Sequence, residues 1–193
     1  NVEMTAFCDV DISKAACAAK AYGTDNAKVY DDYKALLKDA TIDVIHVCTP
    51  NDSHCEITVA GLHAGKHVMC EKPMAKTTAE AQKMIDTAKS TGKKLTIGYQ
   101  NRFRPDSQFL YKSAQRGDLG DIYFGKAHAI RRRAVPTWGV FLDEEAQGGG
   151  PLIDIGTHAL DLTLWMMDNY EPESVMGSTF HKLNKQHDAD RKS

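Results

Sequence analysis

The chain has 193 residues, a formal net charge of −2, and 42% hydrophobic and 26% charged residues. A chain of this length can bury one or two hydrophobic cores, and its composition is ordinary for a globular protein. The balanced charge excludes a generally basic surface, so we expect no nucleic-acid partner. No apolar run approaches the ~20 residues that a membrane-spanning helix needs, so we expect no membrane partner.

The five cysteines are odd in number and include no C-x-x-C pair. Several lie inside apolar runs, which favours reduced, buried thiols over a disulfide framework. No secretory signal peptide is recognisable at the first residues. The sequence therefore predicts a cytoplasmic protein.

The first half of the chain alternates strand-like and helix-like segments. Expected strands cover residues 4–9, 42–48, 66–70 and 94–99, and the apolar run at 42–48 is typical of a strand buried on both faces. Expected helices cover residues 13–22, 31–39, 53–64 and 77–90. Ser53 is a candidate N-cap, Thr77 and Glu80 form a capping-box pattern, and Gly92 ends the last of these helices.

This alternation predicts an α/β fold with a parallel sheet and helices on both of its faces. In such sheets, ligands bind beyond the carboxyl ends of the strands. Three expected strand ends carry polar groups, namely Asp9, Thr49-Pro50-Asn51 and Glu71-Lys72-Pro73.

The pattern changes after about residue 101. We expect a helix at 105–116, a turn at 117–120, a strand at 122–132, an apolar helix at 152–167 and a further strand at 173–183. A polar, glycine-rich loop precedes the apolar helix. The change of pattern places a domain boundary between residues 102 and 103.

Each polar strand end has a functional and a structural interpretation. An acid in the position of Asp9 accepts hydrogen bonds from the adenosine ribose of a dinucleotide and repels a 2′-phosphate. Asp11 is a second candidate for this role. The structural alternative is that Asp9 serves in a turn or caps a helix. Thr49, Pro50 and Asn51 end the most apolar strand, either beside a ligand or in an ordinary strand-to-helix turn. Glu71 and Lys72 are either a solvated pair or a positioned pair, with the backbone fixed by the following proline.

Asp154, His158 and Asp161 have helical spacing, so all three lie on one helix face. One interpretation is a cap aspartate with a core histidine, and a second is a metal site. The third is catalytic, with His158 as a general base and Asp154 orienting it or binding substrate. The glycines at 148–150 and 156 favour the third, because glycine lets a ligand approach the backbone closely.

Five stretches of the chain together resemble the Gfo/Idh/MocA family of NAD(P)-dependent oxidoreductases, which includes glucose–fructose oxidoreductase and inositol dehydrogenase. They are V-C-T-P-N-D-S-H (47–54), G-K-H-V-M-C-E-K-P (65–73), G-Y-Q-N-R-F-R-P (98–105), G-D-L-G-D-I (117–122) and G-G-G-P-L-I-D-I-G-T-H-A-L-D (148–161). The resemblance implies a Rossmann-like, doubly wound parallel sheet. It also implies a following α+β domain with a mostly antiparallel sheet, through which family members form homo-oligomers, either dimers or tetramers.

The resemblance also implies a set of site residues. The family's E-K-P lysine falls on Lys72, and its D-x-G-x-H aspartate and histidine fall on Asp154 and His158, which are the expected catalytic residues. The expected cofactor-binding residues are Asp9, Thr49, Pro50, Asn51, His54, Glu71, Lys72, Asn101 and Trp138. No metal is expected.

The chain departs from the family pattern at both ends. No G-x-G-x-x-G occurs, so the first strand and the phosphate-cradling loop of a Rossmann domain are missing, as is most of the second domain's sheet. We therefore expect a piece of a longer protein, with residues 1–102 from a dinucleotide-binding domain. Residues 103–193 would come from a substrate-binding and oligomerisation domain.

The expected function is hydride transfer between a nicotinamide cofactor and a hydroxyl or keto group of a sugar, sugar alcohol or cyclitol. The expected cofactor is NAD rather than NADP. Two alternatives remain open. One is a non-catalytic relative that binds a sugar or a partner and lacks a functional cofactor loop, and the other is a metal-dependent enzyme that uses Asp154, His158 and Asp161.

Overall fold

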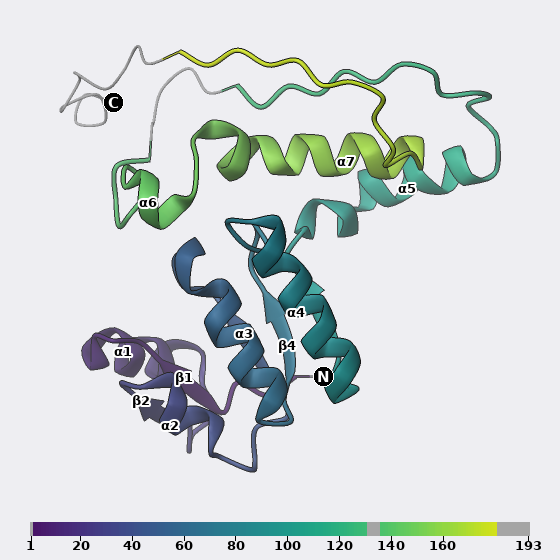
Figure 1. Cartoon of the computed structure of the whole chain (residues 1–193). Coiled ribbons are helices and arrows are strands. Elements are labelled where there is room, and N and C mark those ends of the chain that lie inside the picture. The colour runs from purple at the N-terminus through teal and green to yellow at the C-terminus, as the bar shows by residue number, and fades with distance from the viewer. Residues whose placement is uncertain (1, 131–135, 181–193) are drawn as a thin grey trace. The chain divides into compact units, whose positions relative to one another are not determined.

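The computed structural model describes residues 2–130 and 136–180 (Figure 1). Residues Asn1–Gly98 form one compact unit and a second unit begins at Tyr99. The boundary predicted from the sequence, between residues 102 and 103, falls a few residues later in the chain. None of the described helices is long and apolar enough to cross a bilayer.

Within each sheet of the first unit the strands run parallel. β1 (Ala6–Cys8) pairs with β2 (Lys28–Tyr30), and β3 (Val44–Val47), β4 (His67–Cys70) and β5 (Leu95–Ile97) form a sheet in that order. The parallel α/β prediction is confirmed, but the described strands form two sheets rather than one. The sequence analysis missed β2, because a three-residue strand leaves too little periodicity to detect.

Helices join these strands, and short polar side chains begin several of them. They are α1 (Ile12–Tyr22), α2 (Tyr33–Leu37), α3 (His54–His63) and α4 (Thr78–Thr91). The capping box of Thr77 and Glu80 is confirmed, and Gly92 ends α4 with a φ of 67°. Ser53 occupies the N-cap position of α3 as predicted, but its hydroxyl makes no capping bond and donates to the Pro50 carbonyl instead.

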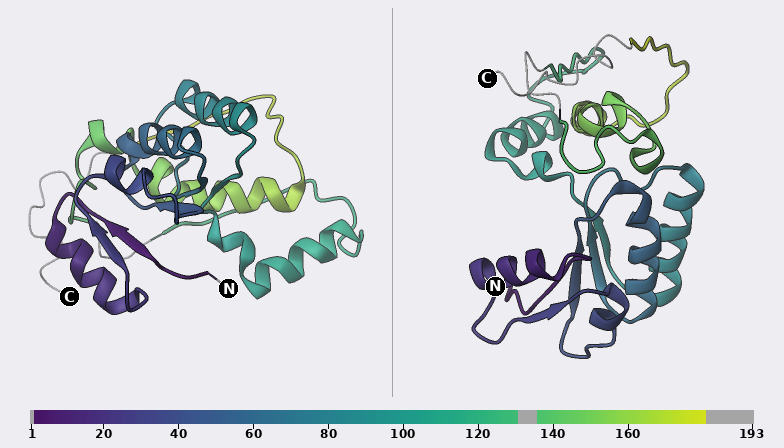
Figure 2. Two further views of the ribbon diagram at one scale, coloured as in Figure 1. Left: turned by 90° about the horizontal axis from the view of Figure 1, so that it is seen from below. Right: turned by 90° about the vertical axis from the view of Figure 1, so that its left-hand side faces the viewer.

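The core of the first unit lies on one face of the β3–β4–β5 sheet. α3 packs against β3 and β4, and α4 packs along α3 (Figures 1 and 2). Burial therefore alternates along β3, where Ile45 and Val47 are buried but Val44 is 55% exposed. The expectation of a strand buried on both faces is wrong, because helix contacts cover only one side of β3 in the described structure.

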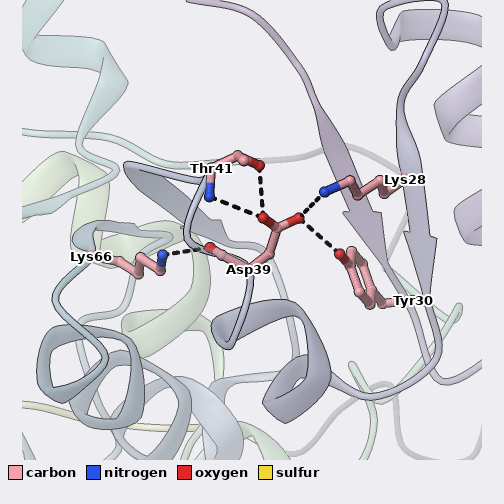
Figure 3. Close-up of polar contacts among 5 residues, drawn as sticks. All are labelled: Lys28, Tyr30, Asp39, Thr41 and Lys66. Atoms are coloured by element: carbon pink, nitrogen blue, oxygen red, sulfur yellow. Dashed lines mark hydrogen bonds and ion pairs between the residues drawn. The ribbon is translucent and has the colours of Figure 1, made fainter.

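A polar cluster around Asp39 joins β2 to the amino ends of β3 and β4 (Figure 3). One carboxylate oxygen of Asp39 accepts from Lys28 Nζ at 2.6 Å and from the Tyr30 hydroxyl at 3.0 Å, both from β2. The other accepts from the backbone N–H and the hydroxyl of Thr41, ahead of β3. The backbone carbonyl of Asp39 accepts from Lys66 Nζ at 2.6 Å, just before β4. The cluster thus ties β2 of one sheet to the approaches of β3 and β4 in the other.

The described residues of the second unit are helical or irregular. A 3₁₀ turn (Gln100–Phe103) leads into α5 (Pro105–Gln115), and α6 (Glu144–Gln147) precedes a π-helical turn (Leu152–Gly156) that continues as α7 (Thr157–Met167). α5 packs on α7, with Tyr111 and Trp165 stacked at a centroid distance of 3.9 Å.

The strands expected at 122–132 and 173–183 are not seen in their described parts, 122–130 and 173–180. Residues 131–132 and 181–183 lie outside the described residues. An extended segment becomes a strand only when a neighbour accepts and donates its backbone hydrogen bonds, which a sequence pattern does not supply. The antiparallel sheet expected for this unit is accordingly absent from the part of it that the structure describes.

Candidate functional site

The carboxyl ends of β3, β4 and β5 lie in register at one edge of the sheet. Val47 pairs with Cys70, and Cys70 pairs with Ile97, so the residues that follow each strand leave the sheet together. The Glu71 N–H donates to the Val47 carbonyl at 2.9 Å, and the Gly98 N–H donates to the Cys70 carbonyl at 2.7 Å. The structure thus brings the predicted Thr49–Asn51 and Glu71–Lys72 segments to the same edge, where parallel sheets bind ligands.

Asp9 follows the last residue of β1 at the carboxyl end of the other sheet. Its Oδ1 accepts from the Asp11 N–H at 2.9 Å, while Asp11 itself accepts from the Ser13 N–H and caps α1. Both acids thus accept local backbone N–H groups, Asp9 in the turn after β1 and Asp11 at the N-cap of α1.

The surroundings of Asp9 are strongly negative. Burial raises the pKa of the Cys8 thiol, and the charges of Asp32, Asp31 and Asp9 raise it further. Three carboxylates therefore act on one thiol at this strand end. Such a field disfavours an additional phosphate dianion.

Glu71 is oriented by a histidine and a glycine. Its Oε1 lies 3.1 Å from His46 Nε2 on β3, and its carboxylate packs over Gly98, where a Cβ would approach the carboxylate atoms to 2.9 Å. The Glu71 side chain remains 34% exposed. Its position is thus fixed by the His46 ring on β3 and by its close approach to Gly98 after β5, while part of the side chain remains accessible.

His54 begins α3 but its ring turns back toward the strand ends. It is 1% exposed, with Nδ1 at 2.7 Å from the Pro73 carbonyl and Nε2 at 2.9 Å from the Thr49 carbonyl. We expected His54 to bind the cofactor, but neither ring nitrogen is left for a ligand in this arrangement. The residue instead joins the two segments on which Asn51 and Lys72 lie.

In the second unit, Asp154 and His158 lie where a π-helical turn becomes α7. Asp154 is inside the π turn, and His158 is in the first turn of α7 and only 9% exposed. Single π turns in longer helices are frequent at functional sites. The His158 ring meets the Tyr99 ring edge-on at 6.3 Å, and the Tyr99 hydroxyl lies 3.0 Å from the Thr157 hydroxyl.

A hollow of about 320 Å³ opens beside His158. Its lining combines polar and apolar side chains, from Asn101, His128, Ala129, Ile130, Ile155, His158, Ala159 and Leu162. Two residues expected at the site, Asn101 and His158, thus line one pocket, whereas Asp154 is not part of its lining.

The sequence analysis missed His128. The segment that carries it runs close over α7, since a Cβ on Gly125 would lie 2.8 Å from Thr163 Cγ2 and 3.1 Å from Met167 Sδ. The glycine permits this approach and so brings the following residues to the pocket. A single glycine three residues before a histidine was the only sequence signal, and it is too weak to use alone.

Asp161, the third member of the helical triplet, is engaged elsewhere. Arg102 Nε donates to its Oδ2 at 2.8 Å, and Arg102 Nη2 donates to its Oδ1. This pairing raises the pKa of the Arg102 guanidinium. The guanidinium also lies over the rings of Tyr99 and Trp165. Both carboxylate oxygens of Asp161 thus bind Arg102, which joins α7 to the 3₁₀ turn at Gln100–Phe103.

The metal interpretation required Asp161 to ligate together with Asp154 and His158. Within residues 2–130 and 136–180, no group of three or more His, Cys, Asp or Glu side chains has the geometry of a metal site. Trp138, expected beside the cofactor, is 62% exposed and packs edge-on against Phe141 at a centroid distance of 5.4 Å.

Comparison with protein families gives matches over most of the chain. Residues 1–99 match the model described as an oxidoreductase family with an NAD-binding Rossmann fold, and residues 108–192 match the GFO/IDH/MocA C-terminal domain.

Two curated relatives are named as dehydrogenases of a glucoside and of inositol. The chain is 45% identical over 186 residues to the D-glucoside 3-dehydrogenase of Escherichia coli K12, covering 96% of this chain and 52% of that protein. It is 28% identical over 169 residues to the inositol 2-dehydrogenase of Salmonella typhimurium, covering 87% of this chain and 48% of that protein. The chain thus spans about half the length of these curated relatives.

A solved structure supports the same relationship. A levoglucosan dehydrogenase in complex with NADH and levoglucosan matches with a TM-score of 0.73 and 27% identity, covering 85% of this chain and 44% of that one. The parallel α/β unit, the helical unit with its histidine pocket and the two matched domain models agree. The chain therefore belongs to the GFO/IDH/MocA family of oxidoreductases.

Proposed function

We propose that the protein transfers a hydride between a nicotinamide cofactor and a hydroxyl or keto group of a sugar, sugar alcohol or cyclitol. The observation that carries the proposal is the hollow beside the buried His158, in a chain whose first 99 residues match an NAD-binding domain. Its lining combines apolar side chains with the polar groups of Asn101, His128 and His158. A polyol has both polar and apolar faces, which suits such a lining.

The proposed chemistry divides the work among three side chains. His158 takes the proton of the substrate hydroxyl, as a general base. Lys72 stabilises the negative charge that develops on the same oxygen, and Asp154 holds neighbouring hydroxyls. The nicotinamide accepts the hydride from the carbon that carried the hydroxyl. The substrate alcohol thereby loses one proton to His158 and one hydride to the cofactor, and it becomes a carbonyl group.

NAD is the proposed cofactor. In this proposal Asp9, which follows β1, accepts from the ribose hydroxyls, and Asp31 and Asp32 add negative charge near the same strand end. A 2′-phosphate would meet like charges there. The levoglucosan dehydrogenase neighbour carries NADH, and its name, like those of the two curated relatives, supports a sugar or cyclitol substrate.

Two measurements test the proposal. NADH fluorescence titrated with the protein should show saturable binding, and a panel of glucosides, inositols and anhydrosugars with NAD should yield NADH for at least one substrate. Binding of a sugar without cofactor binding or turnover would instead support the non-catalytic alternative.

His158→Ala then assigns the base. We expect kcat to fall by ~10²–10⁴-fold, which is typical for loss of a general base, with NADH binding nearly unchanged. His63→Ala, on the exposed end of α3, is the matched control and should keep wild-type kcat. A His158→Ala variant with more than about half of wild-type kcat would remove this histidine from the mechanism.

A homo-oligomer and a cytoplasmic location complete the proposal. Large apolar side chains are highly exposed in the described second unit, including Phe124, Ile130, Val175 and Met176, which supports burial against another copy. All five cysteines are free thiols, which supports a reducing compartment, although Cys8, Cys17 and Cys48 are exposed rather than buried as expected. Light scattering after gel filtration would test the assembly, and fractionation of the source cells would test the location.

A further inference from the structure

The ring of His54 bridges two segments that the sheet itself no longer joins. The last backbone hydrogen bond between β3 and β4 runs from the Glu71 N–H to the Val47 carbonyl. Two residues beyond each end of that bond, the Thr49 and Pro73 carbonyls both point to the His54 ring, at 2.9 Å and 2.7 Å. The histidine thus continues the connection between the two strands past the end of the ladder.

Both partners of the ring are carbonyl oxygens, which can only accept hydrogen bonds. A neutral imidazole has one N–H and one lone pair, so it would satisfy one carbonyl and direct its lone pair at the other. At 2.7–2.9 Å such a contact between two acceptors is repulsive. Only a ring with protons on both nitrogens satisfies the observed geometry.

The position of the ring makes this arrangement demanding. His54 is 1% exposed and is the first residue of α3, where the positive end of the helix dipole opposes a cation. Two charge-assisted hydrogen bonds offset that cost, since bonds of this kind are about twice as strong as neutral ones. A side chain under these constraints has one geometry and holds both carbonyls at fixed positions.

We propose that His54, with both ring nitrogens protonated, is a positioning residue that fixes the spacing between the turn carrying Asn51 and the turn carrying Lys72. The proposal rests on the proposed dehydrogenase function, because it gives those turns a catalytic purpose. It replaces the direct cofactor contact expected of His54 from the sequence.

The first test is independent of activity. Histidine labelled with ¹⁵N is incorporated, and the ring nitrogens of the eight histidines are observed near neutral pH. One ring should show slowly exchanging protons on both nitrogens, and its signals should vanish in His54→Gln but persist in His63→Gln. A His54 ring with a single proton would overturn the proposal.

The second test concerns position. Glutamine donates through its amide nitrogen only, so in His54→Gln one carbonyl loses its donor. Amide exchange at Asn51 and Lys72 should accelerate relative to the His63→Gln control, and kcat should fall by roughly tenfold or more, because small displacements of a catalytic group are costly. A folded variant with unchanged exchange and kcat within about twofold of wild type would contradict the role.

Remaining outcomes are also decisive. If His54→Gln does not fold, His54→Asn takes its place. If neither folds, His54 is a folding determinant and the positioning role fails. If the wild-type protein lacks dehydrogenase activity, the proposed function fails. The ring spectra and the amide exchange would still show whether His54 holds the turns carrying Asn51 and Lys72 at a fixed spacing.

Discussion

The two ends of the parallel strands in the first unit use charged side chains in opposite ways. At the amino ends of β3 and β4, each carboxylate oxygen of Asp39 accepts two hydrogen bonds, and Lys28 and Lys66 donate into the same cluster (Figure 3). At the carboxyl ends, Glu71 is held by His46 yet keeps a side chain that is 34% exposed. One edge uses its charges to join the two sheets, and the other leaves part of the Glu71 side chain exposed.

The comparison shows that residue type alone does not distinguish structural from functional charges. A lysine and an acid occur at both edges of the strands. What differs is the number of backbone and hydroxyl partners that surround the acid, which the structure settles and the sequence does not. We therefore expect substitutions at the carboxyl edge to reduce activity and substitutions at the amino edge to reduce stability.

The largest effect is expected at Lys72. Lys72→Met keeps much of the side-chain volume but removes the charge proposed to stabilise the developing alkoxide, so kcat should fall by ~10²-fold or more. The urea midpoint of unfolding should change little. A variant that unfolds much more easily and turns over normally would place Lys72 with the structural charges.

A smaller effect is expected at Asp9, and it concerns cofactor choice. The wild-type protein should favour NAD over NADP, and Asp9→Ser should shift the ratio of the two kcat/KM values toward NADP by about tenfold, equivalent to ~1.4 kcal/mol. Asp11→Ser is the control, because Asp11 caps α1. A wild-type preference for NADP would mean that Asp9 does not contact the ribose.

Asp39→Asn should leave kcat within about twofold of wild type while lowering the urea midpoint. Hydrogen bonds from Lys28 and Thr41 hold the pKa of the Asp39 carboxyl well below its usual range. Because its folded-state pKa is depressed, the carboxylate stabilises the fold above the unfolded value of about 3.9, and this contribution is lost as the pH falls below that value.

The pH dependence supplies the control for Asp39. The difference between the wild-type and Asp39→Asn midpoints should be constant near neutral pH and should shrink as the pH falls below about 4. A difference that persists unchanged in acid would show that the substitution acts through packing and not through the carboxylate charge.

The smallest effect is expected from Ser53→Ala. The Ser53 hydroxyl does not cap α3, so its removal should cost less than the ~1 kcal/mol typical of a lost N-cap. Thr77→Ala, which removes a true capping box from α4, is the matched comparison and should cost about 1 kcal/mol. Equal losses in thermal unfolding would mean that the Ser53 bond to Pro50 matters as much as a cap.

Much of the first unit was predictable because its signals are local. Thr77, Glu80 and Gly92 mark the ends of α4 through side chains and backbone angles that act within a few residues. The positions of the turns after the strands could be predicted from the prolines and from the point where each apolar run ends. Predictions failed where a distant partner decides the outcome, as for the exposed face of β3 at Val44 and the unformed strand at 122–130.

The sequence by itself determined the alternation of parallel strands and helices, the family, and which motifs carry Lys72, Asp154 and His158. Hydrophobic periodicity, capping residues and short motifs determine these features, because each of them depends only on residues close together in the sequence. Only the tertiary structure decided that His54 joins two turns, that Asp161 belongs to Arg102, that Asp39 ties two sheets together, and that His128 lines the pocket. These contacts join residues distant in sequence, and hydrogen-bond partners at such distances depend on packing that no local pattern encodes.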